Sequence, residues 1–231
     1  MSRLEPAAGF ELLDDPLAAP ALVRESLRNI SRANRWFGGA AAVRFGLERA
    51  LTLTSPGTRL TMVDVGTGLG DLPRMARAWG TARGITLLPV GIERHGAAAR
   101  LARTLGLPVI VGDGGALPFA NGSIDIVLLS QVAHHFAPSA IVHLFRECGR
   151  VARRAVIVAD LRRSSLAALG FRVAGRVMGF DQDTMRDGVT SLRRGFTAES
   201  LTALLGHAGI RAPVVARRPG SRLVAVWHPP V

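Results

Sequence analysis

Short apolar runs alternate with amphipathic stretches through the middle of the chain. Between the runs, apolar residues recur at helical spacing over 72–79, 96–105 and 139–151. Short, nearly continuous apolar strands separated by helices are typical of a parallel sheet that is covered on both faces. The pattern therefore predicts a doubly wound α/β fold. Its first five strands are expected at 60–65, 85–92, 109–111, 124–129 and 155–159.

Two helices are predicted before this core. Apolar residues are spaced three, four and seven apart over 21–37, and a second apolar stripe follows over 40–53. The glycine pair between them ends the first helix, and a Ser-Pro-Gly turn ends the second. We expect residues 1–57 to form an irregular arm and a helical cap on the core domain.

After the fifth strand the alternation is interrupted. One helical stripe covers 166–180, and the polar stretch 181–191 after it is predicted to be mobile. A capped helix then follows over 197–208. With a last pair of strands, the sequence predicts a seven-stranded, mostly parallel sheet in a domain 58–231, with a lid insertion at 162–195. The last pair is expected at 213–216 and 222–227.

Composition narrows the class of protein. The 231 residues are 48% apolar, which suits one well-filled domain, and no apolar run approaches the roughly 20 residues of a membrane span. The net charge is +12, yet all 29 basic residues are arginine, which indicates codon bias as readily as a binding surface. Cys148 is the only cysteine, so a disulfide within the chain and a cysteine zinc cluster are excluded. With no leader sequence in evidence, a cytoplasmic protein is expected.

The stretch TMVDVGTGLGDLPR, residues 61–74, carries the clearest chemical signal. Gly66, Gly68 and Gly70 lie between a strand and a helix, where the backbone can approach an anionic ligand closely. The dinucleotide fingerprint G-x-G-x-x-G fails because its third glycine position is Asp71. A phosphate loop is excluded because the chain has no lysine. What remains is Asp64 two residues before an alternating G-x-G-x-G.

With its downstream motifs, this stretch resembles the class I S-adenosylmethionine-dependent methyltransferases, which have a Rossmann-like fold. Glu93 ends the second strand in PVGIERH, and VGDGGALPFANGSIDIVLLSQVAHHF follows at 111–136. The resemblance implies that Glu93 accepts both ribose hydroxyls, that Asp113 meets the adenine amino group, and that Ser130 and Gln131 line the methionine end. It implies S-adenosylmethionine as the cofactor. The expected cofactor-binding residues are Asp64, Gly66, Thr67, Gly68, Gly70, Glu93, Gly112, Asp113, Gly114, Ser130 and Gln131.

His134 and His135 are the candidate catalytic residues. They follow the fourth strand, where a ring nitrogen could face the transferred methyl group and remove a proton from the acceptor. The alternative is that the pair only packs against the cofactor, and the sequence leaves both open. No metal is expected, because Ser130 stands where metal-dependent catechol-type relatives place an acid. Apolar side chains could line a pocket for an aromatic or polyketide-like acceptor, and the candidates are Trp36, Phe37, Phe171, Met178 and Phe180.

Three functions follow from these observations. The first is O-methylation of a small hydrophobic acceptor, a phenolic or polyketide-like secondary metabolite, because RANRWFGG and the overall layout are similar to bacterial natural-product methyltransferases. The second is C-methylation of a lipid quinone precursor, with transient membrane contact through 166–180 and with Arg172 and Arg176 meeting phosphates. The third is a non-catalytic or nucleic-acid-binding module that uses the arginine-rich C-terminal half. A small-molecule acceptor is the expected partner, and no nucleic acid is expected.

Overall fold

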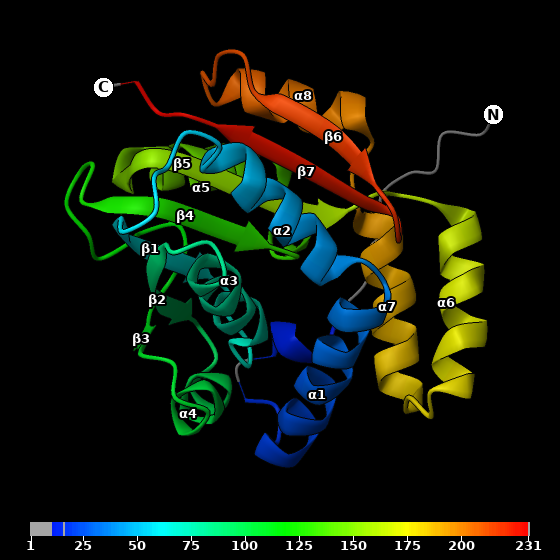
Figure 1. Cartoon of the computed structure of the whole chain (residues 1–231). Coiled ribbons are helices and arrows are strands. Elements are labelled where there is room, and N and C mark those ends of the chain that lie inside the picture. Colours follow the sequence, from blue (N-terminus) through cyan, green and yellow to red (C-terminus); the bar gives the residue numbers. More distant parts are fainter. Residues whose placement is uncertain (1–10, 16, 231) are drawn as a thin grey trace.

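Seven strands form one sheet in the order β3-β2-β1-β4-β5-β7-β6 (Figure 1). The structure is a computed structural model that describes residues 11–15 and 17–230. Neighbouring strands from β3 to β5 are parallel, and β7 is antiparallel to both β5 and β6. The predicted seven-stranded, mostly parallel sheet is confirmed. The strands are β1 Arg59–Val65, β2 Thr86–Glu93, β3 Val109–Val111, β4 Ile124–Ser130, β5 Ala152–Leu161, β6 Val214–Arg218 and β7 Arg222–Trp227.

Helices cover both faces of the sheet, as the apolar strands require. Alternate side chains of one strand point to opposite layers: Met62 packs in the layer of α2 and α3, and Val63 packs in the layer of α5 and α8. Burying both faces removes most of each central strand from water, which is the main stabilising contribution of this core. The helices of these two layers are α2 Gly39–Ala50, α3 Asp71–Thr81, α5 Pro138–Val151 and α8 Ala198–His207.

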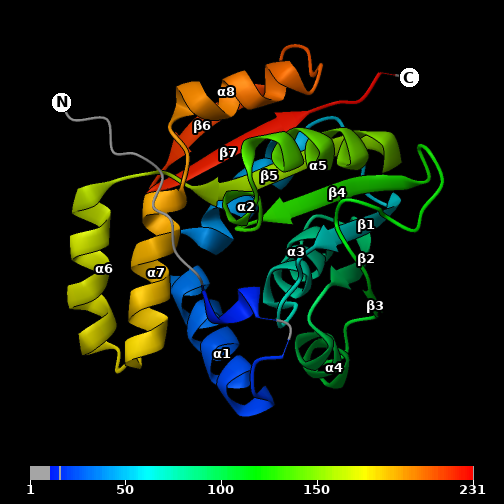
Figure 2. The ribbon, with the colours of Figure 1, turned by 180° about the vertical axis from the view of Figure 1, so that it is seen from behind.

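A second group of helices lies beyond the carboxyl ends of the strands (Figures 1 and 2). It contains α1, α6 and α7, with α6 and α7 side by side, while α4 packs against α1 and β2. A short 3-10 helix, η1, lies against α7, and another, η2, follows β4. Residues 1–10 and 16 of the predicted arm lie outside the described residues. The bounds are η1 Leu12–Asp14, α1 Pro20–Trp36, α4 Gly96–Thr104, η2 Ala133–His135, α6 Ser165–Val177 and α7 Gln182–Arg194.

The prediction of a mobile polar stretch over 181–191 was wrong, because these residues form most of α7. Asp181 caps the helix by accepting a hydrogen bond from the Thr184 backbone N–H at 2.8 Å. Val189 and Leu192 are buried against α6 and β5. These few apolar residues suffice to hold α7 in place because its polar face also forms hydrogen bonds to η1 and α1. The local composition of 181–191 does not indicate those contacts.

The direction of the crossovers reverses between β1 and β4, the two central strands of the parallel part of the sheet. In open α/β sheets, ligands bind in the crevice outside the carboxyl ends at this switch point. The fold therefore directs attention to the ends of β1, β2, β4 and β5. Within the described part of the chain, no helix has both the length and the apolar character needed to cross a bilayer.

Candidate active site

A cavity of about 860 Å³ opens at this switch point. All of the predicted cofactor-binding and catalytic residues line it except Gly70. Gly70 instead caps α3 in the left-handed conformation, with a φ of 70°. A Cβ there would lie 2.5 Å from Leu107 Cδ2, so this glycine shapes the turn without facing the ligand space.

The glycine turn after β1 takes a path that few other residues could follow. Gly66 and Gly68 both have positive φ, 71° and 54°. A Cβ at Gly66 would lie 2.3 Å from Val132 Cγ2, so the turn packs directly under the segment that follows β4. The sequence pattern G-x-G thus corresponds to a steric requirement, and it brings the backbone to the cavity wall.

Glu93 ends β2 with its carboxylate fixed beside this turn. Oε2 accepts the Gly68 backbone N–H and Oε1 accepts the His95 backbone N–H, both at 2.9 Å. Each carboxylate oxygen has a further lone pair, so a bidentate acceptor for two ribose hydroxyls remains available at the cavity wall. This geometry fits the role that the sequence predicts for Glu93.

Asp64 lies at the bottom of the turn and is 2% exposed. It accepts a hydrogen bond from the Thr67 hydroxyl at 2.7 Å. Burial, opposed by the Thr67 hydrogen bond and reinforced by the nearby charges of Asp71 and Glu93, raises the pKa of Asp64 to about 7. A buried carboxyl of this kind suits an incoming ammonium group, whose charge would favour the ionised form.

Asp64 should therefore make the free energy of unfolding of the unliganded protein depend on pH. Its folded pKa of about 7 exceeds the ordinary value of 3.8, so the folded state retains a proton that the unfolded state has released in that interval. The free energy of unfolding therefore falls as pH rises through this interval, by about 1.4 kcal/mol per pH unit for one proton. Urea unfolding of Asp64→Asn and the wild type should show the variant gaining relative stability from about pH 4 to about pH 7. A constant difference would contradict the burial effect.

The end of β4 is strained and tied to α1. Gln131 has a φ of 55°, which is uncommon for a residue with a side chain. Its side-chain amide donates to Asn34 Oδ1, and Asn34 Nδ2 donates to Asp71 at 3.1 Å. This chain of hydrogen bonds joins α1, β4 and α3 around the cavity. Ser130, the residue before, is buried, and its hydroxyl lies 3.3 Å from the Ala159 carbonyl.

Asp113 and its flanking glycines line the cavity just after β3. Asp113 Oδ1 accepts the Gly115 backbone N–H at 2.7 Å, which orients the carboxylate after β3. A Cβ at Gly114 would lie 2.7 Å from Val65 Cγ1, so this loop approaches the end of β1 closely. Gly112 also lines the cavity. The placement agrees with an adenine-binding end, distant in sequence from the glycine turn.

His134 is buried in η2 and paired with Asp160 at the end of β5. The two side chains are 2% and 0% exposed, and His134 Nδ1 lies 2.7 Å from Asp160 Oδ1. Burial alone would raise the pKa of Asp160, but the charge and hydrogen bond of His134 outweigh it and hold that pKa below its ordinary value. With Nδ1 donating to the carboxylate, Nε2 carries the free lone pair, and within residues 11–15 and 17–230 it has no hydrogen-bond partner.

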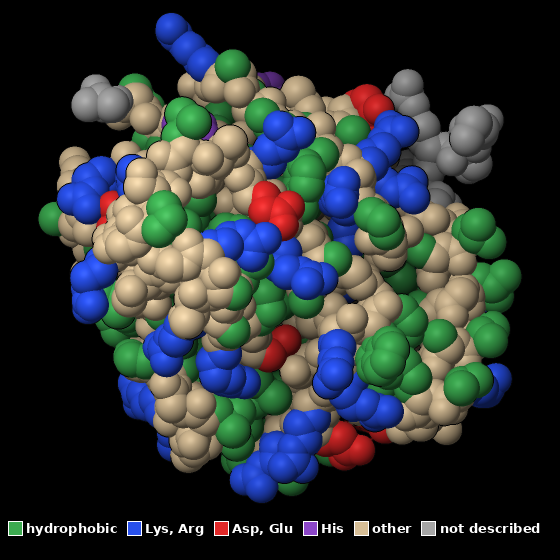
Figure 3. All heavy atoms as spheres, in the orientation of Figure 1, with side chains coloured by type: hydrophobic (Ala, Val, Ile, Leu, Met, Phe, Trp, Pro, Cys, Tyr) green, Lys and Arg blue, Asp and Glu red, His purple; other side chains and the backbone are tan. Residues whose placement is uncertain are grey.

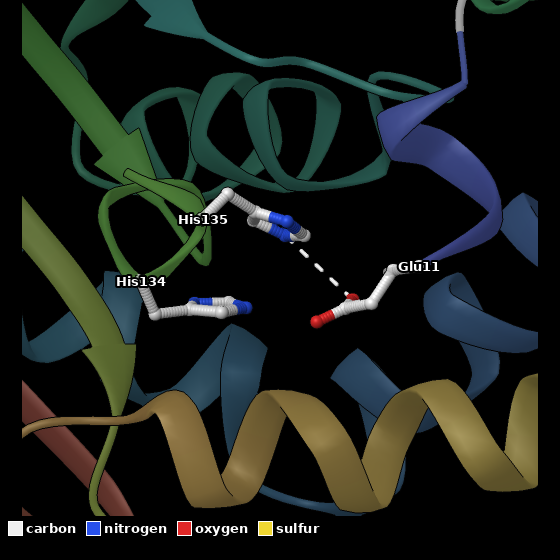
Figure 4. Close-up of side chains that lie close together, drawn as sticks. All are labelled: Glu11, His134 and His135. Atoms are coloured by element: carbon white, nitrogen blue, oxygen red, sulfur yellow. Dashed lines mark ion pairs between the residues drawn. The ribbon is translucent and has the colours of Figure 1, made fainter. Parts of the chain in front are cut away.

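His135 faces the N-terminal segment. Its Nδ1 lies 3.0 Å from Asp14 Oδ1, and its Nε2 lies 3.8 Å from Glu11 Oε2. Glu11 accepts hydrogen bonds from the Ser191 hydroxyl at 2.8 Å and from Arg194 at 3.1 Å. Figure 4 shows both histidine rings extending from η2 toward Glu11, which lies on the other side of the space between η2 and η1.

Several residues of the site were not predicted from the sequence. Asp160 directly follows the strand predicted at 155–159, and an acid at a carboxyl strand end is the signal that could have found it. Glu11 and Asp14 carry no motif and reach the cavity only because η1 is held by α7, where Asp187 accepts the Leu12 backbone N–H at 2.9 Å. Asn34 stood within a predicted amphipathic helix and gave no separate signal.

The remaining wall of the cavity is mainly apolar and comes from α1, α6 and α7. Of the apolar residues predicted to line it, Phe37 and Phe171 do so, with ring centroids 5.6 Å apart. Trp36, Met178 and Phe180 do not line it. Phe180 instead packs behind Phe171. Other apolar side chains at the wall are Leu27, Ile30, Leu166 and Leu192.

Comparisons with known proteins agree with this geometry. Residues 63–159 match the methyltransferase domain family. The chain is 35% identical over 133 residues to an uncharacterized methyltransferase of Mycolicibacterium gilvum, covering 53% of this chain and 51% of that protein. Over residues 63–159 the chain is therefore similar to a methyltransferase domain, and the relative carries the same description. The chain spans about half the length of the curated relative.

The fold is shared with solved structures at low sequence identity. A SAM-dependent methyltransferase from Aquifex aeolicus superposes with a TM-score of 0.62 at 16% identity, covering 92% of this chain and 99% of that one. The structure of PigF with SAH superposes with a TM-score of 0.50 at 21% identity, covering 72% of this chain and 49% of that one. S-adenosylmethionine is the cofactor that the sequence resemblance predicts, and these two structures are described as SAM-dependent and as holding SAH. The glycine turn, the buried Asp64 and the free lone pairs of Glu93 fit it.

Proposed function

We propose that this protein transfers the methyl group of S-adenosylmethionine to a hydroxyl of a small hydrophobic acceptor, with His134 as the general base. The observation that carries the proposal is the buried His134–Asp160 pair, whose unpartnered Nε2 borders the cavity. The bound cofactor supplies an electrophilic methyl group on a sulfonium. The protein supplies position and a proton acceptor.

The proposed base is arranged as a histidine oriented by a carboxylate. Asp160 fixes the tautomer through Nδ1 and stabilises the imidazolium that forms when Nε2 takes the acceptor proton. Asp160 is itself held by the backbone N–H groups of Ala133 and Leu161, at 3.1 and 2.7 Å. Removing the proton as the oxygen attacks the methyl group avoids a positively charged oxonium product.

The two ends of the cavity divide the remaining work in this proposal. Glu93 binds the ribose, Asp113 the adenine amino group, and Asp64 the ammonium, while Ser130 and Gln131 flank the methionine end. The acceptor lies on the other side of the transferred methyl group, against α1 and the insertion 162–195, which acts as a lid. Phe37 and Phe171 support an aromatic or polyketide-like acceptor because they give that side two packed rings.

One observation favours the second candidate, C-methylation of a lipid quinone precursor. Leu166, Leu169, Val173 and Val177 of α6 are 58–85% exposed. Figure 3 shows hydrophobic side chains gathered at the edge formed by α6. Together with Arg172 and Arg176 on the same helix, this row suits transient contact with a bilayer that carries the acceptor.

The test is a transfer assay with methyl-labelled S-adenosylmethionine and extracts of the source organism, followed by structure determination of the labelled product. We expect a labelled hydrophobic small molecule that carries the new methyl group on oxygen. A methyl group on a ring carbon would support the quinone alternative. Absence of S-adenosylhomocysteine binding, or label in nucleic acid alone, would overturn both small-molecule assignments.

A further inference from the structure

Glu11, His134 and His135 bring three metal-ligating groups together at one wall of the cavity (Figure 4). One carboxylate oxygen and one nitrogen of each ring all lie within 4.8 Å of one another. Both Nδ1 atoms are engaged elsewhere, so the available atoms are the two Nε2 atoms. His134 Nε2 is buried and has no hydrogen-bond partner among the residues that the structure describes, so its lone pair is available to a ligand.

The Nδ1 atoms of His134 and His135 have the carboxylate partners that are common beside metal-binding histidines. Each Nδ1 faces a carboxylate, Asp160 at 2.7 Å and Asp14 at 3.0 Å. A histidine that binds a metal through one nitrogen usually donates its other N–H to a carboxylate or carbonyl, which fixes the ring and its tautomer. The rings also pack on each other, with centroids 4.3 Å apart. The ligand atoms are thus oriented before any ion arrives.

The charge and anchoring of the third ligand are also suitable. Glu11 is 6% exposed and held through Ser191 and Arg194. The carboxylates around the rings are those of Glu11, Asp14 and Asp160. The guanidinium groups of Arg194 and Arg222 offset two of these three charges. With neutral imidazoles the cluster therefore retains one negative charge, which favours a cation.

We propose that Glu11, His134 and His135 form a binding site for a divalent transition-metal ion, for which Zn²⁺ matches two imidazoles and one carboxylate. Three protein ligands leave a coordination position facing the cavity. The ion uses the same Nε2 lone pair of His134 that takes the acceptor proton. The effect on activity rests on the proposed function: an ion bound to Nε2 blocks the base, so it inhibits methyl transfer.

Binding is tested by calorimetric titration of Zn²⁺ into the tag-free full chain, with S-adenosylhomocysteine present and absent. We expect one ion per chain, with affinity reduced at least about 10-fold in Glu11→Gln and in His135→Ala. The matched controls are Glu48→Gln and His143→Ala, because both side chains are exposed and outside the cavity. Co²⁺ in place of Zn²⁺ should give visible absorption bands that the two site variants lose.

Absence of stoichiometric binding, or binding that both site variants leave unchanged, would overturn the proposed metal site. The activity measurement separates this from the proposed function. Turnover that falls as Zn²⁺ fills the site would support both the metal site and the role of His134 as the base. Zn²⁺ that binds through Glu11 and His135 but raises turnover would uphold the site and overturn His134 as the base, together with the inhibitory role.

Discussion

His134→Ala is expected to lower methyl transfer about 100-fold or more while leaving S-adenosylhomocysteine binding close to that of the wild type. The reason is that the Nε2 atom of His134 is buried at the acceptor side and has no hydrogen-bond partner among the described residues. The other ring nitrogen, Nδ1, is held by Asp160, which is fully buried. The measurement is turnover with the identified acceptor, together with calorimetry for the cofactor product.

Two further variants distinguish catalysis from packing. His134→Gln retains a donor toward Asp160 and most of the volume but supplies no base, so its turnover should also fall. His143→Ala removes a ring that hydrogen-bonds the Gly115 carbonyl outside the cavity, and it should keep its rate. Near-normal turnover in both His134 variants would show that the histidine only packs. A loss confined to His135→Ala would assign the base to that residue.

Gly68→Val is expected to abolish measurable binding of S-adenosylhomocysteine. Gly68 has a φ of 54°, where a β-branched residue is strained, and its backbone N–H is held by Glu93 at the cavity wall. A Cβ would lie 3.2 Å from Leu27 Cδ2, and the branches of valine would enter the ligand space. Loss of about 3 kcal/mol of binding free energy corresponds to a decrease of more than 100-fold in affinity.

The matched control for this variant is Gly106→Val. Gly106 also has positive φ, 82°, but a Cβ there meets nothing within 4 Å and the residue follows α4 away from the cavity. It reproduces the backbone strain without filling the site, so binding should persist at a reduced melting temperature. Calorimetry that finds unchanged affinity in Gly68→Val would remove the glycine turn from the cofactor site.

The two predictions address opposite ends of one cavity. Gly68 belongs to a contiguous motif that approaches the donor, whereas His134 acts through Asp160, 26 residues later in the chain. The donor end is built from local turns at strand ends, and the acceptor end is built from segments that meet only after folding. This division explains why the sequence supports a cofactor more firmly than an acceptor.

The sequence by itself determined the α/β alternation and the seven strands, and it carried the donor motifs. Those features depend on local physics: apolar runs too short for helices, glycines at turns, and acids at carboxyl strand ends. Parallel strands place such ends at one edge, so Asp64, Glu93 and Asp113 could be brought to one cavity without coordinates. Gly70 was the exception, because sequence spacing does not show which glycine faces the ligand.

Only the tertiary structure decided the acceptor side. The stretch 181–191 is polar and was expected to be mobile, yet it forms α7 because η1, α1 and α6 supply partners for its different faces. Glu11 and Asp14 reach His135 through that helix, more than 120 residues away in sequence, with no motif to announce them. Long-range pairing of this kind depends on how several elements pack together, and no local pattern encodes it.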